Sequence, residues 1–371
     1  MMSLTKKITA VAATGVLALS LVSCATTSGE TTADGAADCN VGISMPTRAL
    51  ERWINDGEQL QELLEAAGCT VDLQYADNKT DQQISQIQNQ VAGGSKILVV
   101  AAVDGEVLAP VLAEAKGQDA TVIAYDRLIN GTENVDYYAT FDNYQVGTLQ
   151  GQYIEEQLGL ADGAGPFNLE PFAGSPDDNN ARYFFSGAWD VLLPYVESGQ
   201  LVVPSGRSPE SNDAWASIGI QGWASNLAQS EMDNRLSSFY PGSEGVDVVL
   251  SPNDSLAIGI IASLKSAGYV PGENYPIISG QDADQANVSA ILAGEQSMTV
   301  WKDTRTLGQQ VFDMIQQIVA GEEVTVNDTE TYDNGEKIVP AFLLEPEVVV
   351  ESDVQTKLVD SGFIQASDLG L

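Results

Sequence analysis

The sequence predicts an α/β fold with two lobes. Short apolar runs alternate with amphipathic segments from residue 39 onward, which is the order expected of parallel strands joined by helices. The alternating series begins again after Asn143. The chain of 371 residues is also long for a single hydrophobic core. These observations favour two doubly wound, Rossmann-like lobes with parallel sheets.

The first series of strands and helices belongs to a lobe that is predicted to begin at residue 39 and to run to residue 143. Its expected helices each present one apolar face; Leu60, Leu63 and Leu64 form such a face, and Gly68 is a typical helix stop. The predicted strands are 41–45, 71–75, 97–100, 122–125 and 135–141. The predicted helices are 50–67, 80–92 and 105–116.

The second series has the same alternation. Its predicted helices are 145–158, 179–195, 226–239 and 255–267, and its predicted strands are 166–170, 202–203, 246–250 and 277–279. Residues 286–319 predict two helices that flank a strand at 297–300. Residues 329–332 and 338–344 predict a hairpin, because an Asn-Gly pair between them suits a turn with positive φ. The tail 361–371 is expected to be peripheral.

The N-terminus has the parts of a secretory signal. Lys6 and Lys7 precede an apolar stretch at 8–22, which ends in Ser23 and Cys24. The ending resembles a bacterial lipobox, so we expect residues 1–23 to be a lipoprotein signal peptide and Cys24 to be lipidated. A buried first helix is the alternative, but the stretch has no polar second face and is short for a membrane span.

Residues 24–38 are small and polar, which indicates a flexible tether. We therefore expect an exported protein that lipid holds at the outer face of the cytoplasmic membrane.

Charge and composition exclude several classes of function. The chain has 16 basic and 52 acidic side chains and a formal net charge of −36, which opposes binding to nucleic acid and to anionic lipid surfaces. It has no histidine, so Ser-His-Asp and Cys-His catalysis are excluded and a zinc site is disfavoured. No loop has the pattern of a calcium site. We expect no metal and no cofactor.

Cys39 and Cys69 are the two cysteines that remain after Cys24. Each stands two positions before a predicted strand, and those strands would pair in parallel. An exported compartment permits a disulfide, and the matching positions could bring the sulfurs together. The sequence leaves open whether the two are bridged.

Polar side chains gather where predicted strands end. Asp126 and Arg127 follow the strand at 122–125, and Asp142 and Asn143 follow the next one. In open α/β sheets ligands bind outside the carboxyl ends of strands. Carboxylate, amide and guanidinium groups there suit a small polyhydroxylated ligand. The alternative is a pair of surface turns with a solvated ion pair.

The same pattern recurs at other predicted strand ends. The candidates are Arg52, Trp53, Asn179, Trp215, Trp223, Asp254, Asp282 and Lys302. Single members are open to other interpretations: Asn179 and Asp254 could be helix N-caps, and Trp53 or Trp215 could belong to the core. The repetition along both lobes is the stronger signal.

These residues lie in motifs with a family resemblance. In order along the chain the motifs are RALERW, VIAYDRLI, ATFDN, AGSPDDNNA, LSPNDSLA, SGQDAD and TVWKDT. They resemble the periplasmic sugar-binding proteins of ATP-driven (ABC) importers, in the xylose-binding and multiple-monosaccharide-binding branch. The resemblance extends from residue 41 to about residue 358.

The resemblance implies the type I periplasmic binding fold, with two lobes joined by a hinge of three crossovers. The expected lobes are 39–143 with 285–325, and 144–284 with 326–371. By position, the implied sugar ligands are Arg52, Trp53, Asp126, Arg127, Asn143, Asn179, Asp254, Asp282 and Lys302. Trp215 is preferred to Trp223 as the second stacking aromatic, although the loop around them departs from the family pattern.

The resemblance also implies the function. We expect a solute-binding lipoprotein that captures an aldose of the xylose, glucose, galactose or arabinose class between closing lobes and delivers it to the permease subunits. It would be a monomer and not an enzyme. A chemotactic or signalling sensor on the same fold is the main alternative. A glycoside hydrolase is disfavoured, because most candidate acids stand next to Arg, Lys or Asn.

Overall fold

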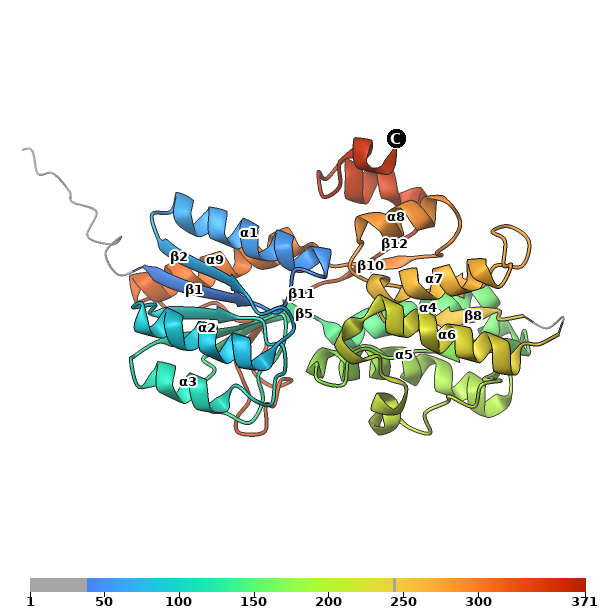
Figure 1. The fold of residues 1–371 in the computed structure, drawn as a ribbon, viewed down its shortest axis with the longest axis horizontal. Helices are drawn as coiled ribbons and strands as arrows, with labels where there is room; N and C mark the ends of the chain where they lie inside the picture. The colour runs from blue at the N-terminus through green and yellow to red at the C-terminus, as the bar shows by residue number, and fades with distance from the viewer. Residues whose placement is uncertain (1–38, 243–244) are drawn as a thin grey trace, which may run out of the picture. The chain divides into compact units, whose positions relative to one another are not determined.

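The computed structural model describes residues 39–242 and 245–371, and contains two parallel sheets with helices packed against them (Figure 1). The first sheet has the strand order β11-β5-β4-β3-β1-β2. Its strands are β1 (Asn40–Met45), β2 (Thr70–Tyr75), β3 (Ile97–Val100), β4 (Thr121–Tyr125), β5 (Tyr137–Phe141) and β11 (Ala341–Leu344). All neighbours pair in parallel. The expected α/β class is confirmed.

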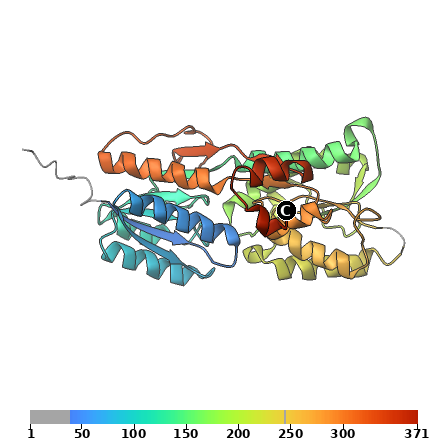
Figure 2. The ribbon, with the colours of Figure 1, turned by 90° about the horizontal axis from the view of Figure 1, so that it is seen from above.

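Helices cover both faces of the first sheet. They are α1 (Glu51–Ala66), α2 (Thr80–Ala92), α3 (Ala109–Lys116) and α9 (Thr304–Ala320). Figures 1 and 2 show α1 beside α9 over one face and α2 beside α3 over the other. Alternate residues of a strand point to opposite faces, so Val99 packs in the core with α1 and α9, whereas Leu98 packs in the core with α2 and α3.

The second sheet has the order β7-β6-β8-β9 and is also parallel. Its strands are β6 (Phe167–Pro171), β7 (Leu201–Val202), β8 (Val248–Leu250) and β9 (Ile277–Ile278). The helices of this region are α4 (Asn143–Leu158), α5 (Asn179–Ser198), α6 (Ser225–Phe239), α7 (Asp254–Ser266) and α8 (Gln285–Leu292). Val249 packs with α6 and α7, whereas Val248 packs with α5.

The chain passes between the two regions three times, as expected. The crossovers lie between β5 and α4, between β10 (Thr299–Trp301) and α9, and between β11 and β12 (Glu347–Val349). β10 and β12 pair antiparallel beside the second sheet. Each crossover is only a few residues long, so the carboxyl ends of strands from both sheets lie close to the crossovers.

The lobe assignments after residue 284 need correction. Residues 285–325 were expected in the first lobe, but Ala290 of α8 and Val300 of β10 pack in the core of the second sheet, and only α9 packs on the first. Residues 326–371 were expected in the second lobe, but β11 pairs in parallel with β5. The apolar run at 341–344 has the composition of a strand that could join either sheet. Its membership of the first sheet follows only from its pairing with β5.

Two smaller expectations also changed. The Asn334-Gly335 turn is present with Gly335 at φ 89°, but only isolated antiparallel bridges flank it, because β11 pairs with β5 instead of extending a hairpin. The C-terminal tail is not wholly peripheral: Ile364 is buried, and the Phe363 ring packs edge-on against Trp301.

Cys39 and Cys69 form a disulfide at the amino ends of β1 and β2. Residues 1–38, which include the expected signal peptide, the expected tether and Cys24, fall outside the described residues. In the part of the chain that the structure describes, no helix is both long and apolar enough to cross a membrane.

Candidate functional site

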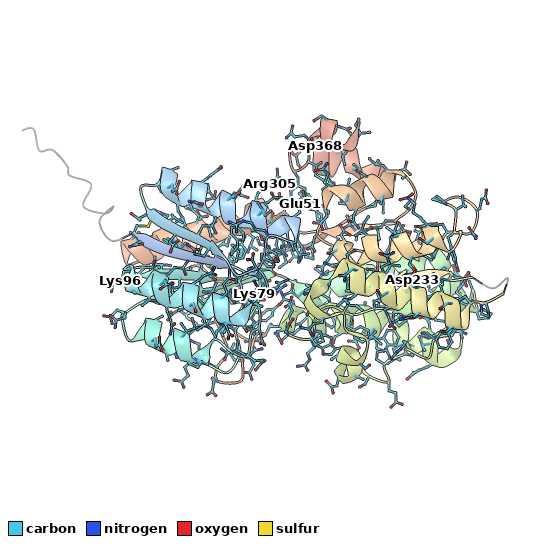
Figure 3. The ribbon with its side chains drawn as sticks, in the orientation of Figure 1. Glu51, Lys79, Lys96, Asp233, Arg305 and Asp368 are labelled. Carbon is cyan, nitrogen blue, oxygen red and sulfur yellow. A yellow bond between two sulfur atoms is a disulfide. The ribbon has the colours of Figure 1, made fainter. Side chains whose placement is uncertain are left out.

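A hollow lined by polar and aromatic side chains lies at the carboxyl ends of strands from both sheets. We call it the cleft; its lining residues are Leu50, Arg52, Trp53, Asp126, Arg127, Asp178, Asn180, Phe184, Trp223, Asn253, Gln281, Asp282 and Lys302. In Figure 3, Lys96 just before β3 and Lys79 just after β2 mark the amino and carboxyl edges of the first sheet, and Glu51 at the start of α1 lies on the carboxyl side. The cleft therefore occupies the position where α/β sheets bind ligands.

Several predicted ligand residues meet in the cleft. They are Arg52, Trp53, Asp126, Arg127, Asp282 and Lys302. The first four follow β1 and β4 of the first sheet, and the last two follow β9 and β10 of the second region. The sequence motifs thus located groups that lie far apart in the chain but close together in space.

Arg52 is the centre of the charged network. Its Nη2 donates to Asp126 Oδ2 at 2.9 Å and to Asp56 Oδ2 at 2.9 Å, and its Nη1 lies 3.6 Å from Asp282 Oδ1. All four side chains are nearly buried. The Arg52 guanidinium thus holds carboxylates that come from both sides of the cleft.

The pKa values of two carboxyl groups on the first side are shifted in opposite directions. Burial opposes ionisation of Asp126, but the cations of Arg52, Lys302 and Arg127 outweigh it and hold the pKa of Asp126 below its usual range. Asp126 is therefore a carboxylate at neutral pH, able to accept hydrogen bonds from ligand hydroxyls. Burial raises the pKa of Asp56 to about 6, against the opposing charge of Arg52.

Asp178 connects the two sides of the cleft. Its Oδ2 lies 3.0 Å from Nε of Arg127 and accepts from Trp223 Nε1 at 3.1 Å. Burial raises the pKa of Asp178, while the charge of Arg127 opposes the shift. On the other side of the cleft, Lys302 Nζ lies 2.9 Å from Asp282 Oδ1. Each of these cations has a carboxylate from the second region within ion-pair distance.

Several polar atoms in the cleft are buried without a hydrogen-bond partner. Among the described residues they include Nε of Arg52, Nε of Arg127, Oδ1 of Asp282 and Oε1 of Gln281. Arg127 and Asp282 have an ion-pair neighbour at a short distance but not in hydrogen-bond geometry. Buried polar groups are nearly always paired in proteins, so these donors and acceptors suit a polar ligand.

Three cleft residues have backbone conformations that side chains rarely adopt. Asp126 has φ 60°, Trp223 has φ 55° and Asp282 has φ 101°. Such conformations cost of order 1–3 kcal/mol each and persist where the surroundings enforce them. The position of Trp223 also depends on Gly174, because a Cβ at residue 174 would lie 2.0 Å from the indole ring.

Four predicted ligand residues do not line the cleft. Asn179 is half-buried at the start of α5, and its neighbour Asn180 lines the cleft instead. Trp215 is half-buried against the second core, and Trp223 takes the place expected of it. Both differences have one cause: a loop or helix start fixes which of two nearby residues points into the cleft, and the sequence pattern does not reveal that.

Asp254 and Asn143 are the other two predicted ligand residues that do not line the cleft. Asp254 is fully buried behind the cleft, where it accepts from Gln296 Nε2 at 2.8 Å, Thr299 Oγ1 at 3.0 Å and the Asp284 N–H at 3.0 Å. Its neighbour Asn253 lines the cleft and also caps α7 through Leu256 N–H. Asn143 starts α4 and donates to Thr140 Oγ1 at 3.3 Å.

The sequence analysis missed further lining residues. Asp178, Asn180, Asn253 and Gln281 stand within the quoted motifs AGSPDDNNA, LSPNDSLA and SGQDAD, so a signal for each was present. Phe184 lies one helical turn after Asn180 on the same face of α5, and helix periodicity would have identified it.

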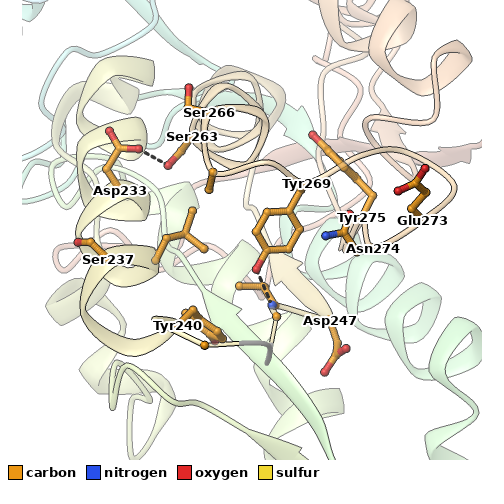
Figure 4. Close-up of a pocket in the computed structure, with 15 residues that line it drawn as sticks. Asp233, Ser237, Tyr240, Asp247, Ser263, Ser266, Tyr269, Glu273, Asn274 and Tyr275 are labelled. Carbon is orange, nitrogen blue, oxygen red and sulfur yellow. Dashed lines mark hydrogen bonds between the residues drawn. The ribbon is translucent and has the colours of Figure 1, made fainter.

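A larger hollow lies elsewhere and lacks the chemistry of the cleft (Figure 4). It lies beside Val246 and Asp247, just before β8, at the amino end of the second sheet. Tyr269 Oη accepts from Val246 N–H at 3.0 Å there, and Ser263 donates to Asp233. Its described lining has acids but no Arg or Lys. Within the described ranges, no group of three His, Cys, Asp or Glu side chains could hold a metal ion.

Known proteins share this fold and sequence. A family model described as a periplasmic binding protein domain matches residues 41–323. The multiple sugar-binding periplasmic protein SbpA of Azospirillum brasilense is 52% identical over 324 residues, which cover 87% of this chain and 89% of that protein. The D-xylose-binding periplasmic protein of Escherichia coli (strain K12) is 34% identical over 334 residues, which cover 90% of this chain and 93% of that protein.

A solved structure is also similar to this chain in both fold and sequence. The ABC transporter solute binding protein of Clostridium phytofermentans, crystallised with bound β-D-glucose, has a TM-score of 0.85 and 48% identity, and the match covers 89% of this chain and 99% of that one. The fold, the polar cleft and these likenesses agree with the resemblance that the motifs carry. The chain belongs to the periplasmic binding proteins, in their type I sugar-binding branch.

Proposed function

We propose that the protein captures one aldose monosaccharide in the cleft and delivers it to the permease of an ABC importer. The observation that carries this is the cleft itself, where ionised Asp126 and the buried, unpaired polar atoms of Arg52, Arg127, Gln281 and Asp282 converge. Pyranose hydroxyls need both donors and acceptors, and charge-assisted hydrogen bonds are about twice as strong as neutral ones.

Aromatic side chains supply the other half of sugar recognition. Trp53, Phe184 and Trp223 line the cleft, and aromatic faces pack well against the apolar C–H faces of a pyranose. Relatives of this chain are named for multiple sugars and for D-xylose, and the related solved structure holds β-D-glucose. We infer the same ligand class here, with xylose, glucose, galactose and arabinose as the candidates.

Binding is proposed to close the two regions on the sugar. Ligand groups come from both sheets, so a sugar contacts both only in the closed form and shifts the population toward it. We infer that the closed form is what the permease recognises. The protein would be a binding protein and not an enzyme, since cations keep Asp126 ionised, and the family to which the chain belongs is one of binding proteins.

Calorimetry with D-xylose, D-glucose, D-galactose and L-arabinose tests the proposal. At least one sugar should bind with a dissociation constant in the micromolar range or tighter, and Arg127→Ala should abolish binding. Arg182→Ala is the matched control, because Arg182 is exposed and does not line the cleft. A protein that binds none of the four, or an Arg127→Ala variant with wild-type affinity, would contradict the proposal.

We also propose that the protein is an exported lipoprotein anchored at Cys24 and acting as a monomer. The support is the motif of a positive region, an apolar region and Leu21-Val22-Ser23-Cys24. Cells supplied with a labelled fatty acid should incorporate it into the wild-type protein and not into Cys24→Ser. Equal labelling of the two would contradict the anchor.

A further inference from the structure

The backbone carbonyl of Asp126 is held by an unusual number of donors. It accepts from Tyr138 Oη at 2.6 Å, from Thr140 Oγ1 at 2.9 Å and from Asn180 Nδ2 at 2.8 Å. Tyr138, Thr140 and Asn180 are all fully or almost fully buried. A carbonyl oxygen has two lone pairs, so three donors saturate it, and this carbonyl belongs to a residue with φ 60°.

The hydroxyls of β5 explain why this backbone conformation persists. Tyr138 and Thr140 are two residues apart on β5 and therefore point to the same face of the sheet, where both reach the carbonyl of Asp126 at the end of β4. An aspartate with positive φ is uncommon. The left-handed conformation turns the chain at the end of β4, while the Asp126 carboxylate lies against Arg52 at 2.9 Å.

Tyr138 also contacts a cleft residue of the other region. Its hydroxyl lies 3.1 Å from Asn180 Oδ1, while Asn180 Nδ2 donates to the Asp126 carbonyl. A tyrosine hydroxyl has a single hydrogen, so that hydrogen is shared between the Asp126 carbonyl and the Asn180 amide oxygen. One buried hydroxyl thus contacts a cleft residue from each sheet, although Tyr138 does not line the cleft.

Asn143 extends the same arrangement. It donates to Thr140 Oγ1 at 3.3 Å, and Thr140 donates in turn to Asp126. The sequence analysis expected Asn143 to contact the ligand directly, but it stands behind Thr140 and outside the cleft. Its contact with the site is indirect, through the hydroxyl of Thr140.

We propose that Tyr138 and Thr140 are positioning residues for sugar binding, which hold Asp126 in its left-handed conformation and, through Tyr138, align Asn180 with it. This inference rests on the proposed sugar-binding function and adds residues that do not touch the ligand. It predicts that losing either hydroxyl weakens sugar binding although no residue that lines the cleft has been substituted.

The test compares Tyr138→Phe and Thr140→Val with Tyr137→Phe. Tyr137 is the matched control, because it is the neighbouring residue of β5, is half-buried and packs with the core on the opposite face. Calorimetry with D-glucose should give a dissociation constant about tenfold higher for Tyr138→Phe, because Asn180 Oδ1 loses its donor. The constant should be several-fold higher for Thr140→Val, because Asn143 Nδ2 loses its acceptor. Each substitution also removes one of the three donors that hold the Asp126 carbonyl. Tyr137→Phe should stay within twofold of wild type.

Repeating the substitutions in an Asn180→Ala variant separates an effect on the position of Asn180 from a general loss of packing. In Asn180→Ala, the additional effect of Tyr138→Phe on affinity should shrink, because one of its two partners is gone, while the effect of Thr140→Val should persist. Equal effects of both substitutions in both backgrounds would overturn the link to Asn180.

Hydrogen exchange of the sugar-free proteins tests the backbone claim without any ligand. The amides at 126–130 should exchange faster in Tyr138→Phe and Thr140→Val than in wild type, while those of β3 stay unchanged. Unchanged exchange at 126–130, or faster exchange with wild-type affinity for glucose, would overturn the inference. A wild-type protein that binds no sugar would instead refute the proposed function, and the exchange data would still decide whether these hydroxyls hold Asp126.

Discussion

Asp126 and Asp254 occupy similar places in the two regions of the molecule but have different surroundings. Each follows closely on a buried parallel strand, β4 in the first sheet and β8 in the second, and both side chains are almost fully buried. Asp126 lines the cleft with Arg52, Arg127 and Lys302 nearby, whereas Asp254 lies behind the cleft among neutral donors.

The charges around the two carboxyl groups shift their pKa values in opposite directions. Cations hold the pKa of Asp126 below its usual range despite burial. Burial raises the pKa of Asp254, and the nearby carboxyl groups of Asp284 and Asp282 add to the rise. The same residue type at a strand end can therefore be an ionised group in the cleft or a buried group behind it, and the neighbouring charges distinguish the two.

The largest expected effect is on binding through Asp126. Asp126→Ala should raise the dissociation constant for the preferred aldose at least a hundredfold, because it removes charge-assisted hydrogen bonds to the sugar and leaves Arg52 with one carboxylate fewer. Calorimetry gives the affinity, and circular dichroism of the sugar-free variant shows whether it is folded. Affinity within threefold of wild type would contradict the role given to Asp126.

Asp254→Ala should have the opposite profile. It leaves Gln296, Thr299 and the Asp284 N–H without their acceptor, and each buried group left unpaired costs roughly 1–3 kcal/mol. Urea unfolding of the sugar-free protein should therefore show a loss of at least about 3 kcal/mol, with a smaller effect on affinity than that of Asp126→Ala. The comparison fails if Asp254→Ala unfolds like wild type yet no longer binds sugar.

Substitutions of Trp223 and Trp215, both in the second region, should change the affinity for sugar less than Asp126→Ala does. Trp223→Ala should weaken sugar binding about tenfold or more, because it removes a cleft wall and the donor to Asp178. Trp215→Ala is the matched control, since Trp215 packs against the core outside the cleft. Sugar titrations should show a larger loss of affinity for Trp223→Ala than for Trp215→Ala. A larger loss for Trp215→Ala would indicate that Trp215, and not Trp223, contacts the sugar.

The last expected effect is on the pH dependence of stability. Burial, with Asp282 and Glu51 nearby, raises the pKa of Asp284 to about 8, and burial raises that of Asp56 to about 6, whereas an unfolded aspartate has a pKa of about 3.9. The folded state thus binds more protons than the unfolded state between pH 4 and 8, so these groups make stability fall as pH rises.

Thermal unfolding of the sugar-free protein should therefore give a higher midpoint at pH 5 than at pH 8. Asp284→Asn separates this titration from the general relief of negative charge at low pH. Between pH 6 and 8 the wild type should lose stability relative to Asp284→Asn. A constant difference between the two proteins across that range would show that Asp284 does not titrate there.

Local patterns were enough to predict most of the fold. The run at 97–100 became β3 with the expected bounds, and the expected helix at 80–92 became α2 unchanged, because apolar periodicity and stop signals act within one element. Cys39 and Cys69 were recognised as candidates for a disulfide for the same reason, since parallel strands starting at matching positions bring their ends together. The sequence left the pairing open, and the structure contains the Cys39–Cys69 disulfide.

The site was predictable where a strand leads directly into it. Asp126 and Arg127 follow β4 with no intervening loop, and both line the cleft. Asn180 and Trp223 follow loops, and sequence reasoning chose Asn179 and Trp215 instead. A loop sets its own direction through contacts such as that of Gly174 with the Trp223 ring, which are distant in sequence.

The amino-acid order therefore sufficed for the α/β class, for several of the strand ends that line the cleft and for the sugar-binding family. Tertiary structure alone decided that β11 joins the first sheet, that Asn253 and not Asp254 lines the cleft, and that Tyr138 reaches both Asp126 and Asn180. The physical reason is the separation along the chain over which each kind of interaction acts. Periodicity and capping act over a few residues, whereas strand pairing, burial and the pKa of a carboxyl group depend on residues that only folding brings together.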